Sequence, residues 1–207
     1  GLRTRETLAA ADRQTGKSRF AISTAALMPG VVLALGMLGN IAFGAFMPLY
    51  ADELGMDGAQ WVFLVYAAMV ILVRVFGARL PDVLGPGRCG TIASLVIAAG
   101  LACMALIHSP AGLFVGTVIF AFGISFHYPS LMTLVVNRAT VRERSAAVAT
   151  FTAFFDVATG LGGLLMGVAA TIGGYRTAFA TAAVSALAAL VILRLVVIPA
   201  GATASVV

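Results

Sequence analysis

Long stretches without charge constrain this chain more than any other feature. Residues 20–51 and 89–137 contain no Asp, Glu, Lys or Arg, and residues 145–175 contain one ionisable side chain of these types, Asp156. A helix needs about 20 mostly apolar residues to cross a bilayer. Hydrophobic residues make up 61% of the chain and charged residues 10%, against roughly 25% charged in a soluble domain. The sequence therefore predicts an all-α membrane protein.

The uncharged stretches and the segments between them predict six transmembrane helices. Residues 89–137 are long enough for two spans, because the sequence HSPAG within them is a turn signal. The other spans are predicted at residues 29–50, 60–80, 145–172 and 177–197. This division gives three parts: a cytoplasmic linker or loop over residues 1–28, a six-helix bundle over residues 29–198, and a cytoplasmic tail over residues 199–207.

The charged residues alternate between two sets of loops, which predicts the orientation of the helices. We call the loops on one predicted face of the membrane the first set and those on the other face the second set. The second set contains Arg176, together with Asp52, Glu53 and Asp57. Basic residues favour cytoplasmic loops, so we expect both termini in the cytoplasm. The other twelve basic residues fall in the first set: Arg3, Arg5, Arg13, Lys17, Arg19, Arg74, Arg79, Arg88, Arg138, Arg142, Arg144 and Arg194.

Several other kinds of function fit the sequence poorly. The net charge of +5 follows from the loop pattern, so no nucleic-acid partner is expected. Cys89 and Cys103 lie in one apolar segment at a spacing that fits neither a metal site nor a redox pair, and are expected to be buried free thiols. No metal and no cofactor are predicted.

An intramembrane serine protease is an alternative class of function for a six-helix membrane protein. The sequence GISFH places Ser125 two residues before His127. Residues two apart on a regular helix point about 200° away from each other, so this pair cannot form a catalytic dyad. The chain is therefore not expected to be an enzyme.

Three predicted helices carry polar side chains near the middle of the membrane. Asp156 lies 11 residues after Ser145, and His127 lies 11 residues before Arg138. Both are therefore about 16 Å from the predicted cytoplasmic end. Asn40 is also near mid-span. Ionisable groups at this depth normally face a bundle interior or a wet cavity, so these three residues are the candidates for a proton-coupling site or substrate cavity.

Each candidate shares one helical face with small residues, which allow helices to approach closely in a membrane. We expect these faces to point inward. Structural roles stay open: His127 as a donor to a carbonyl freed by Pro129, Asp156 as a partner of a neighbouring hydroxyl, and Asn40 in helix packing. The three faces are Thr152, Asp156, Gly160, Gly163 and Gly167; Gly116, Phe120, Gly123, His127 and Ser130; and Gly36, Asn40 and Gly44.

Three segments together resemble the C-terminal half of a major facilitator superfamily transporter, especially the arabinose-efflux and drug–proton antiporter-like branch. They are FMPLYADELG, VYAAMVILVRVFGARLPDVLGPGR and RERSAAVATFTAFFDVATGLGGLLMG, and the resemblance extends over residues 29–198. It implies half of a twelve-helix fold in a cell membrane, which we expect to be a bacterial inner membrane. It also implies a second, N-terminal six-helix half as a partner.

The second segment resembles the cytoplasmic signature loop of that family. Ala78 and Val83 depart from the family pattern, so the loop is a weakened copy, and a simple solvated loop stays open as an alternative. The resemblance implies a cytoplasmic gating role for the matching residues Arg74, Asp82, Gly85 and Arg88.

The family resemblance implies a secondary active transporter, with proton-coupled efflux of a small molecule by alternating access as the expected function. Low dielectric disfavours the charged form of a carboxylate, so proton uptake by Asp156 could be tied to which side of the membrane is open. The expected partners are the lipid bilayer, a small-molecule substrate and protons. The alternatives are a non-transporting membrane scaffold, a channel and a homodimeric half-transporter.

Overall fold

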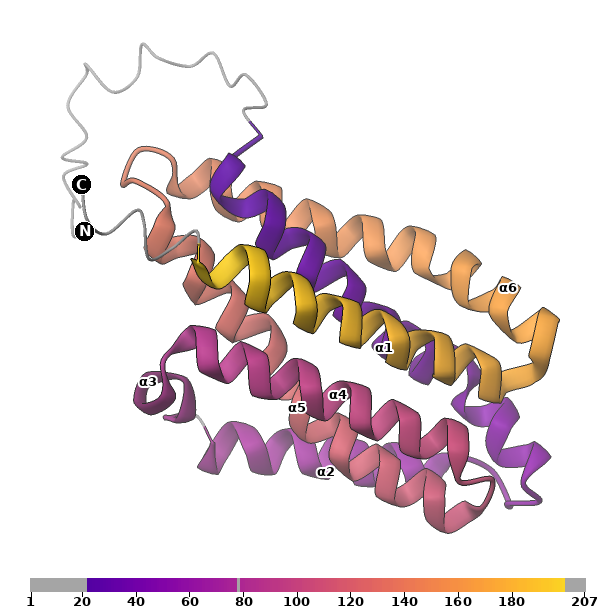
Figure 1. The fold of residues 1–207 in the computed structure, drawn as a ribbon. Helices are drawn as coiled ribbons and strands as arrows, with labels where there is room; N and C mark the ends of the chain where they lie inside the picture. The colour runs from indigo at the N-terminus through magenta and orange to yellow at the C-terminus, as the bar shows by residue number, and fades with distance from the viewer. Residues whose placement is uncertain (1–21, 78, 200–207) are drawn as a thin grey trace, which may run out of the picture.

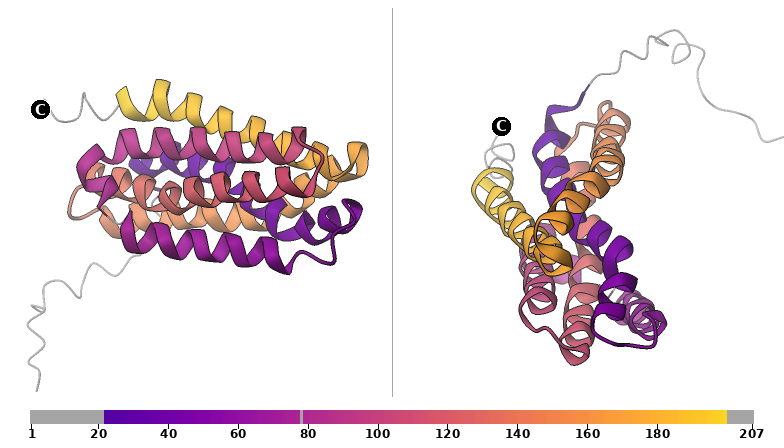
Figure 2. Two further views of the ribbon diagram at one scale, coloured as in Figure 1. Left: turned by 90° about the horizontal axis from the view of Figure 1, so that it is seen from below. Right: turned by 90° about the vertical axis from the view of Figure 1, so that its right-hand side faces the viewer.

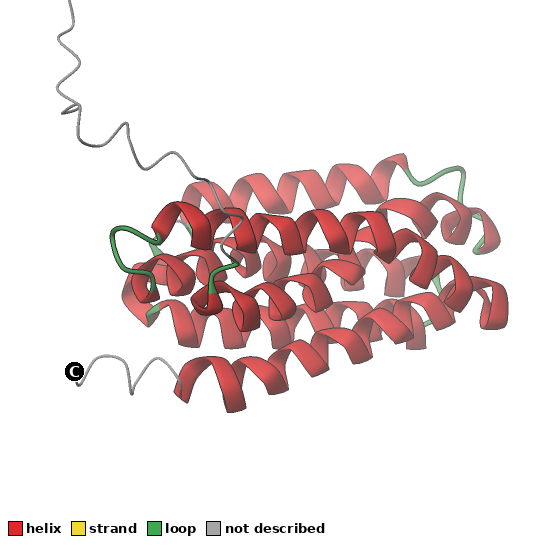
Figure 3. Ribbon diagram, turned by 90° about the horizontal axis from the view of Figure 1, so that it is seen from above, coloured by secondary structure: helices red, strands yellow, loops and turns green. Residues whose placement is uncertain are grey.

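The computed structural model describes residues 22–77 and 79–199, and nearly all of these residues are helical (Figure 1 and Figure 3). The helices lie side by side as an elongated bundle, which confirms the prediction of an all-α fold. They are α1 (Thr24–Glu53), α2 (Gln60–Phe76), α3 (Leu80–Leu84), α4 (Pro86–Leu106), α5 (Pro110–Arg138), α6 (Arg144–Ile192) and the π-helix η2 (Leu193–Val197).

Four of the described helices are long and apolar enough to cross a membrane: α1, α4, α5 and α6 together with η2. Helix α2 has 17 residues, slightly fewer than the ~20 that a span needs. Helix α6 is broken at Gly173 and Gly174, and Gly174 has a φ of 76°, which glycine adopts readily. The chain turns back at this break (Figure 1 and Figure 2), between the segments predicted as the fifth and sixth spans.

The helix ends follow local signals in the sequence. The side chain of Ser109 in the predicted turn accepts a hydrogen bond from the Gly112 N–H at 3.1 Å, which caps α5. Helix α1 begins at Thr24, earlier than the predicted start at residue 29, because Pro29 is accommodated inside the helix. Residues 1–21 of the predicted linker and residues 200–207 of the predicted tail lie outside the described residues.

Packing divides the helices into two closely associated pairs, α1 with α6 and α4 with α5. One apolar core lies near the Gly173 turn and includes Phe43, Tyr50, Leu101 and Phe120. A second core lies toward the opposite end and includes Leu33, Leu131, Phe151 and Leu193. The α2–α3 connection, the α5–α6 turn and the end of η2 share this opposite end (Figure 1), so the described basic residues of the first loop set gather there. We call it the basic end.

Candidate functional site

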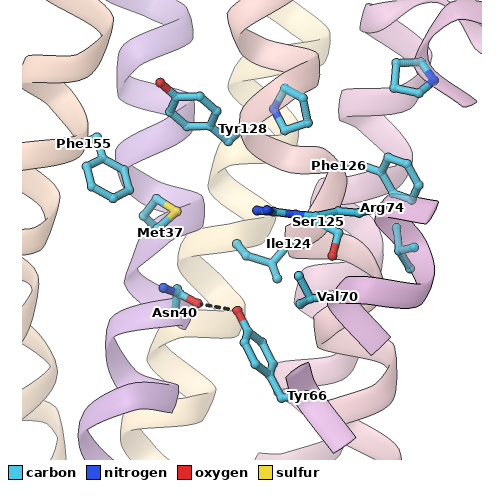
Figure 4. A pocket seen from close by; sticks show the side chains of 13 residues that line it. Met37, Asn40, Tyr66, Val70, Arg74, Ile124, Ser125, Phe126, Tyr128 and Phe155 are labelled. Carbon is cyan, nitrogen blue, oxygen red and sulfur yellow. Dashed lines mark hydrogen bonds between the residues drawn. The ribbon is translucent and has the colours of Figure 1, made fainter. Parts of the chain in front are cut away.

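A cavity of about 500 Å³ lies between α1, α2, α5 and the first part of α6 (Figure 4). Pockets of roughly 300–1,000 Å³ are typical of small-molecule sites. The walls are largely aliphatic and aromatic, with a few polar groups. The lining residues are Met37, Asn40, Tyr66, Val70, Val73, Arg74, Pro81, Ile124, Ser125, Phe126, Tyr128, Pro129 and Phe155.

The polar side chains of this cavity come from three helices: Tyr66 and Arg74 from α2, Ser125 and Tyr128 from α5, and Asn40 from α1. The Tyr66 hydroxyl donates a hydrogen bond to Asn40 Oδ1 at 3.1 Å (Figure 4). Arg74 lies two helical turns further along α2 and brings a guanidinium group to the same cavity. Ser125 donates its hydroxyl to the Ala121 carbonyl of its own helix at 2.7 Å. The cavity therefore combines a neutral hydrogen-bonded pair with one cationic group.

Sequence reasoning identified Asn40 and Arg74 but gave them different roles. The structure places both in the wall of one cavity, although Arg74 was assigned to the gating loop. Tyr66 was not predicted as a site residue. A usable signal was present, because residues 66, 70 and 74 share one face of a helix at a spacing of four.

His127 is fully buried and is not among the residues that line this cavity. Its imidazole packs against Gly36 of α1, where an added Cβ would overlap the ring. Among the described residues neither ring nitrogen has a hydrogen-bond partner of acceptable distance and angle. His127 therefore lies in a helix contact and is separated from the cavity.

Asp156 lies on an exposed face of α6. Ideal Cβ atoms added at Gly160, Gly163 and Gly167 on the same face would have no atom within 4 Å. The predicted inward stripe of α6 thus points away from the described bundle. The face of α6 that packs on α1 instead contains Gly162, where a Cβ would lie 2.5 Å from Ile41 Cδ1. The structure does not bring together Asp156, His127 and Asn40.

The predicted gating loop lies at the basic end of the bundle. Gly85 separates α3 from α4 and has a φ of 76°. Arg88 follows in the first turn of α4 and is exposed. Asp82 belongs to α3. The part of the chain that the structure describes does not include the side chain of Asp82 or any of Ala78.

The described residues hold no group of three or more His, Cys, Asp or Glu side chains that could bind a metal ion. Cys89 is buried and Cys103 is partly buried, and both are free thiols. Ser125 faces the cavity while His127 packs on α1, so the two side chains form no dyad.

Comparisons with known proteins place the whole described bundle in one family. The family model described as Major Facilitator Superfamily matches residues 27–205. An uncharacterized MFS-type transporter of Salmonella typhimurium is 33% identical over 159 residues, which are 77% of this chain and 41% of that protein. Another, from Pseudomonas aeruginosa, is 28% identical over 161 residues, 78% of this chain and 40% of its own length.

A comparison with solved structures finds the same fold. The crystal structure of a peptide transporter POT in complex with sulfate aligns with a TM-score of 0.75 at 22% identity, over 82% of this chain and 37% of that chain. At this identity the likeness concerns the fold alone. The chain spans about two-fifths of the length of the curated relatives that it matches.

Proposed function

This chain belongs to the major facilitator superfamily, and we propose that it forms the C-terminal half of a secondary active transporter that exports a small molecule in exchange for protons. We propose that it has six membrane spans. Helix α2 is the second span, and the segments of α6 before and after the break at Gly173 and Gly174 are the fifth and sixth. We also propose that both termini lie in the cytoplasm, since the helix ends and turns that contain the described basic residues of the first loop set lie at one end of the bundle (Figure 1).

The observation that carries the proposal is the cavity between α1, α2, α5 and α6. Its volume suits a small organic molecule, and its aromatic walls can hold an apolar body. Asn40, Tyr66 and Arg74 can hydrogen-bond polar or anionic groups of that molecule. In a two-half transporter this wall would face the N-terminal half across the substrate path.

The N-terminal half is the partner that we propose for the open face of α6. The chain matches only about two-fifths of its relatives, and the face around Gly160 and Gly163 has no neighbour among the described residues. Small residues allow another helix to approach closely. Asp156 would then lie between the two halves, shielded from lipid.

Asp156 is the residue that we propose for proton coupling. It is the only ionisable side chain of α6 between Ser145 and Tyr175, so its own helix supplies no cation to balance its charge. A carboxylate in such a setting favours a proton when water is excluded and releases it when water enters. Gly85 and Arg88, at the cytoplasmic end, would contribute to gating, together with Asp82.

The test uses the full-length transporter in proteoliposomes that contain a pH-sensitive dye. A panel of small compounds is screened for those that drive proton movement, and counterflow of each active compound is measured separately. In Asp156→Asn we expect the proton movement to be lost while counterflow persists with little dependence on pH. Asp57→Asn, which removes a carboxylate outside the spans, is the matched control and should retain both activities.

Uphill transport by Asp156→Asn with a normal pH dependence would contradict the coupling role. A homodimeric half-transporter is the alternative with a distinct outcome, because residues 1–207 alone would then transport the active compound. A scaffold or a channel would show neither counterflow nor saturable proton movement with any compound.

A further inference from the structure

A second cavity, of about 640 Å³, lies on another side of the bundle, between the start of α4 and the end of the last helix. Its charged lining residues are Arg88 and Arg194, and its apolar ones include Leu84, Ile92 and Ile198. None of these residues lines the proposed substrate cavity. Apart from the gating role proposed for Gly85 and Arg88, the transport function proposed above assigns no role to this second cavity or to Arg194.

The two arginines come from different helices, and neither makes an ion pair with a described residue. The nearby Arg138 differs, because it donates a hydrogen bond to the Val197 carbonyl at the end of η2. Arg138 thus holds the helix end, whereas no described residue occupies the guanidinium groups of Arg88 and Arg194, which can bind an anion. Two guanidinium groups on one cavity match a phosphate group well.

Close helix packing holds the two sides of this cavity together. A Cβ added at Gly87 of α4 would lie 3.5 Å from Ile198, and one added at Gly90 would lie 3.3 Å from Leu193. Arg194 lies within the π-helix η2, a rare geometry that is frequent at functional sites. In the first turn of α4, Pro86 has no N–H and the Cys89 N–H donates to the Gly85 carbonyl, which leaves the N–H groups of Gly87 and Arg88 for an anion.

An apolar surface continues from each arginine toward the middle of the membrane. On α4, Ile92 is 43% exposed and Leu95 is 52% exposed, and both follow Arg88 on its helical face. On α6, Val191 precedes Arg194 by three residues and is 52% exposed. Both helices thus pair a cation at the basic end with exposed aliphatic side chains deeper in the bilayer.

We propose that this cavity binds an anionic phospholipid from the leaflet at the basic end. Arg88 and Arg194 hold the phosphate, and an acyl chain lies along Ile92, Leu95 and Val191. Basic pockets between membrane helices bind anionic headgroups in this way. The lipid would join α4 to the end of the last helix, on a side of the bundle separate from the substrate cavity.

The experiment measures lipid contact and requires no transport assay. The full-length transporter is reconstituted in nanodiscs with photoactivatable phosphatidylglycerol or with the phosphatidylcholine analogue that has the same acyl chains. Crosslinked peptides covering residues 86–106 and 187–199 are quantified by mass spectrometry. We expect phosphatidylglycerol to label both peptides. The concentration of phosphatidylglycerol that gives half-maximal labelling should be about fivefold higher in Arg194→Gln, and about 25-fold higher when Arg88→Gln is added.

Two matched variants separate a defined site from a diffuse surface charge. Arg142→Gln removes an exposed arginine in the α5–α6 turn at the same end of the bundle and should leave labelling of these peptides unchanged. Arg194→Lys keeps the charge and should retain most of the labelling. An unchanged melting temperature of Arg194→Gln shows that the fold is intact.

Three outcomes would overturn the proposal. Equal labelling by the phosphatidylcholine analogue would mean that the headgroup charge is not recognised. An equal loss of labelling in Arg142→Gln and Arg194→Gln would mean that only the general surface potential acts. Displacement by millimolar inorganic phosphate, without displacement by unlabelled phosphatidylglycerol, would assign the site to a free anion.

Discussion

Two glycine-bearing surfaces of this bundle look alike in sequence and differ in the structure. At the contact of α4 with α5, a Cβ on Gly100 would lie 2.5 Å from the Phe120 nitrogen and 2.8 Å from the Gly116 carbonyl. Along α6, a Cβ on Gly160 or Gly163 would meet nothing within 4 Å. One surface is a closed contact between two backbones, and the other is open.

The difference shows what a stripe of small residues does and does not specify. Glycine in a helix interior costs about 1 kcal/mol relative to alanine in water. The α4–α5 contact offsets this cost within the bundle, because the helices pack backbone to backbone. The α6 stripe has no such contact among the described residues, which fits a face that another half of the protein covers. Helical spacing identifies a site of close approach, but it does not identify the partner.

The largest effect on folding is expected for Gly100→Ala. The new methyl group would overlap backbone atoms of α5, which cannot rotate away as a side chain can. We expect the free energy of unfolding to fall by about 3 kcal/mol, with a lower melting temperature and a smaller monodisperse yield of the full-length transporter. Gly44→Ala, on an α1 face where an added Cβ would also meet nothing within 4 Å, is the matched control. An equal loss of the free energy of unfolding in both variants would mean that overlap with the α5 backbone is not the cause.

A smaller effect is expected for Gly162→Ala, on the face of α6 that packs against α1. Here the added Cβ would approach the ends of two flexible side chains, Ile41 at 2.5 Å and Leu38 at 2.9 Å. These can shift, so we expect a loss of about 1 kcal/mol, measured as a melting-temperature change between those of Gly100→Ala and the wild type. A loss as large as that of Gly100→Ala would show that this contact is equally rigid.

Much of the fold could be predicted from the sequence. The uncharged stretches indicated membrane helices, the turn signal before α5 was confirmed, and the break at Gly173 and Gly174 falls between two predicted spans. The start of α1 was less accurate, because a proline inside a long helix resembles a helix entry. These features depend on local properties of the chain, such as hydropathy and turn chemistry.

The candidate site was harder to predict, since it depends on which helices are neighbours. The spacing of residues placed Asp156 and His127 at one depth, but depth along a helix does not fix direction around it. His127 faces α1 and Asp156 faces outward. Tyr66 and Arg74 line the same cavity as Asn40 because α2 lies beside α1 and α5, and this arrangement of helices cannot be read from the spacing within one helix.

The smallest loss of stability is expected for Gly160→Leu, although it adds the largest side chain. No described atom lies within 4 Å of the new Cβ, and leucine has a higher helix propensity than glycine, so the free energy of unfolding should not fall. If the N-terminal half covers this face, the leucine must instead obstruct the approach of the two halves during the transport cycle. We expect counterflow by the full-length protein to slow on the order of tenfold, because such conformational steps often limit turnover, with no fall in the melting temperature. Unchanged counterflow would indicate that lipid covers this face, and then the position proposed for Asp156 between the two halves would be wrong.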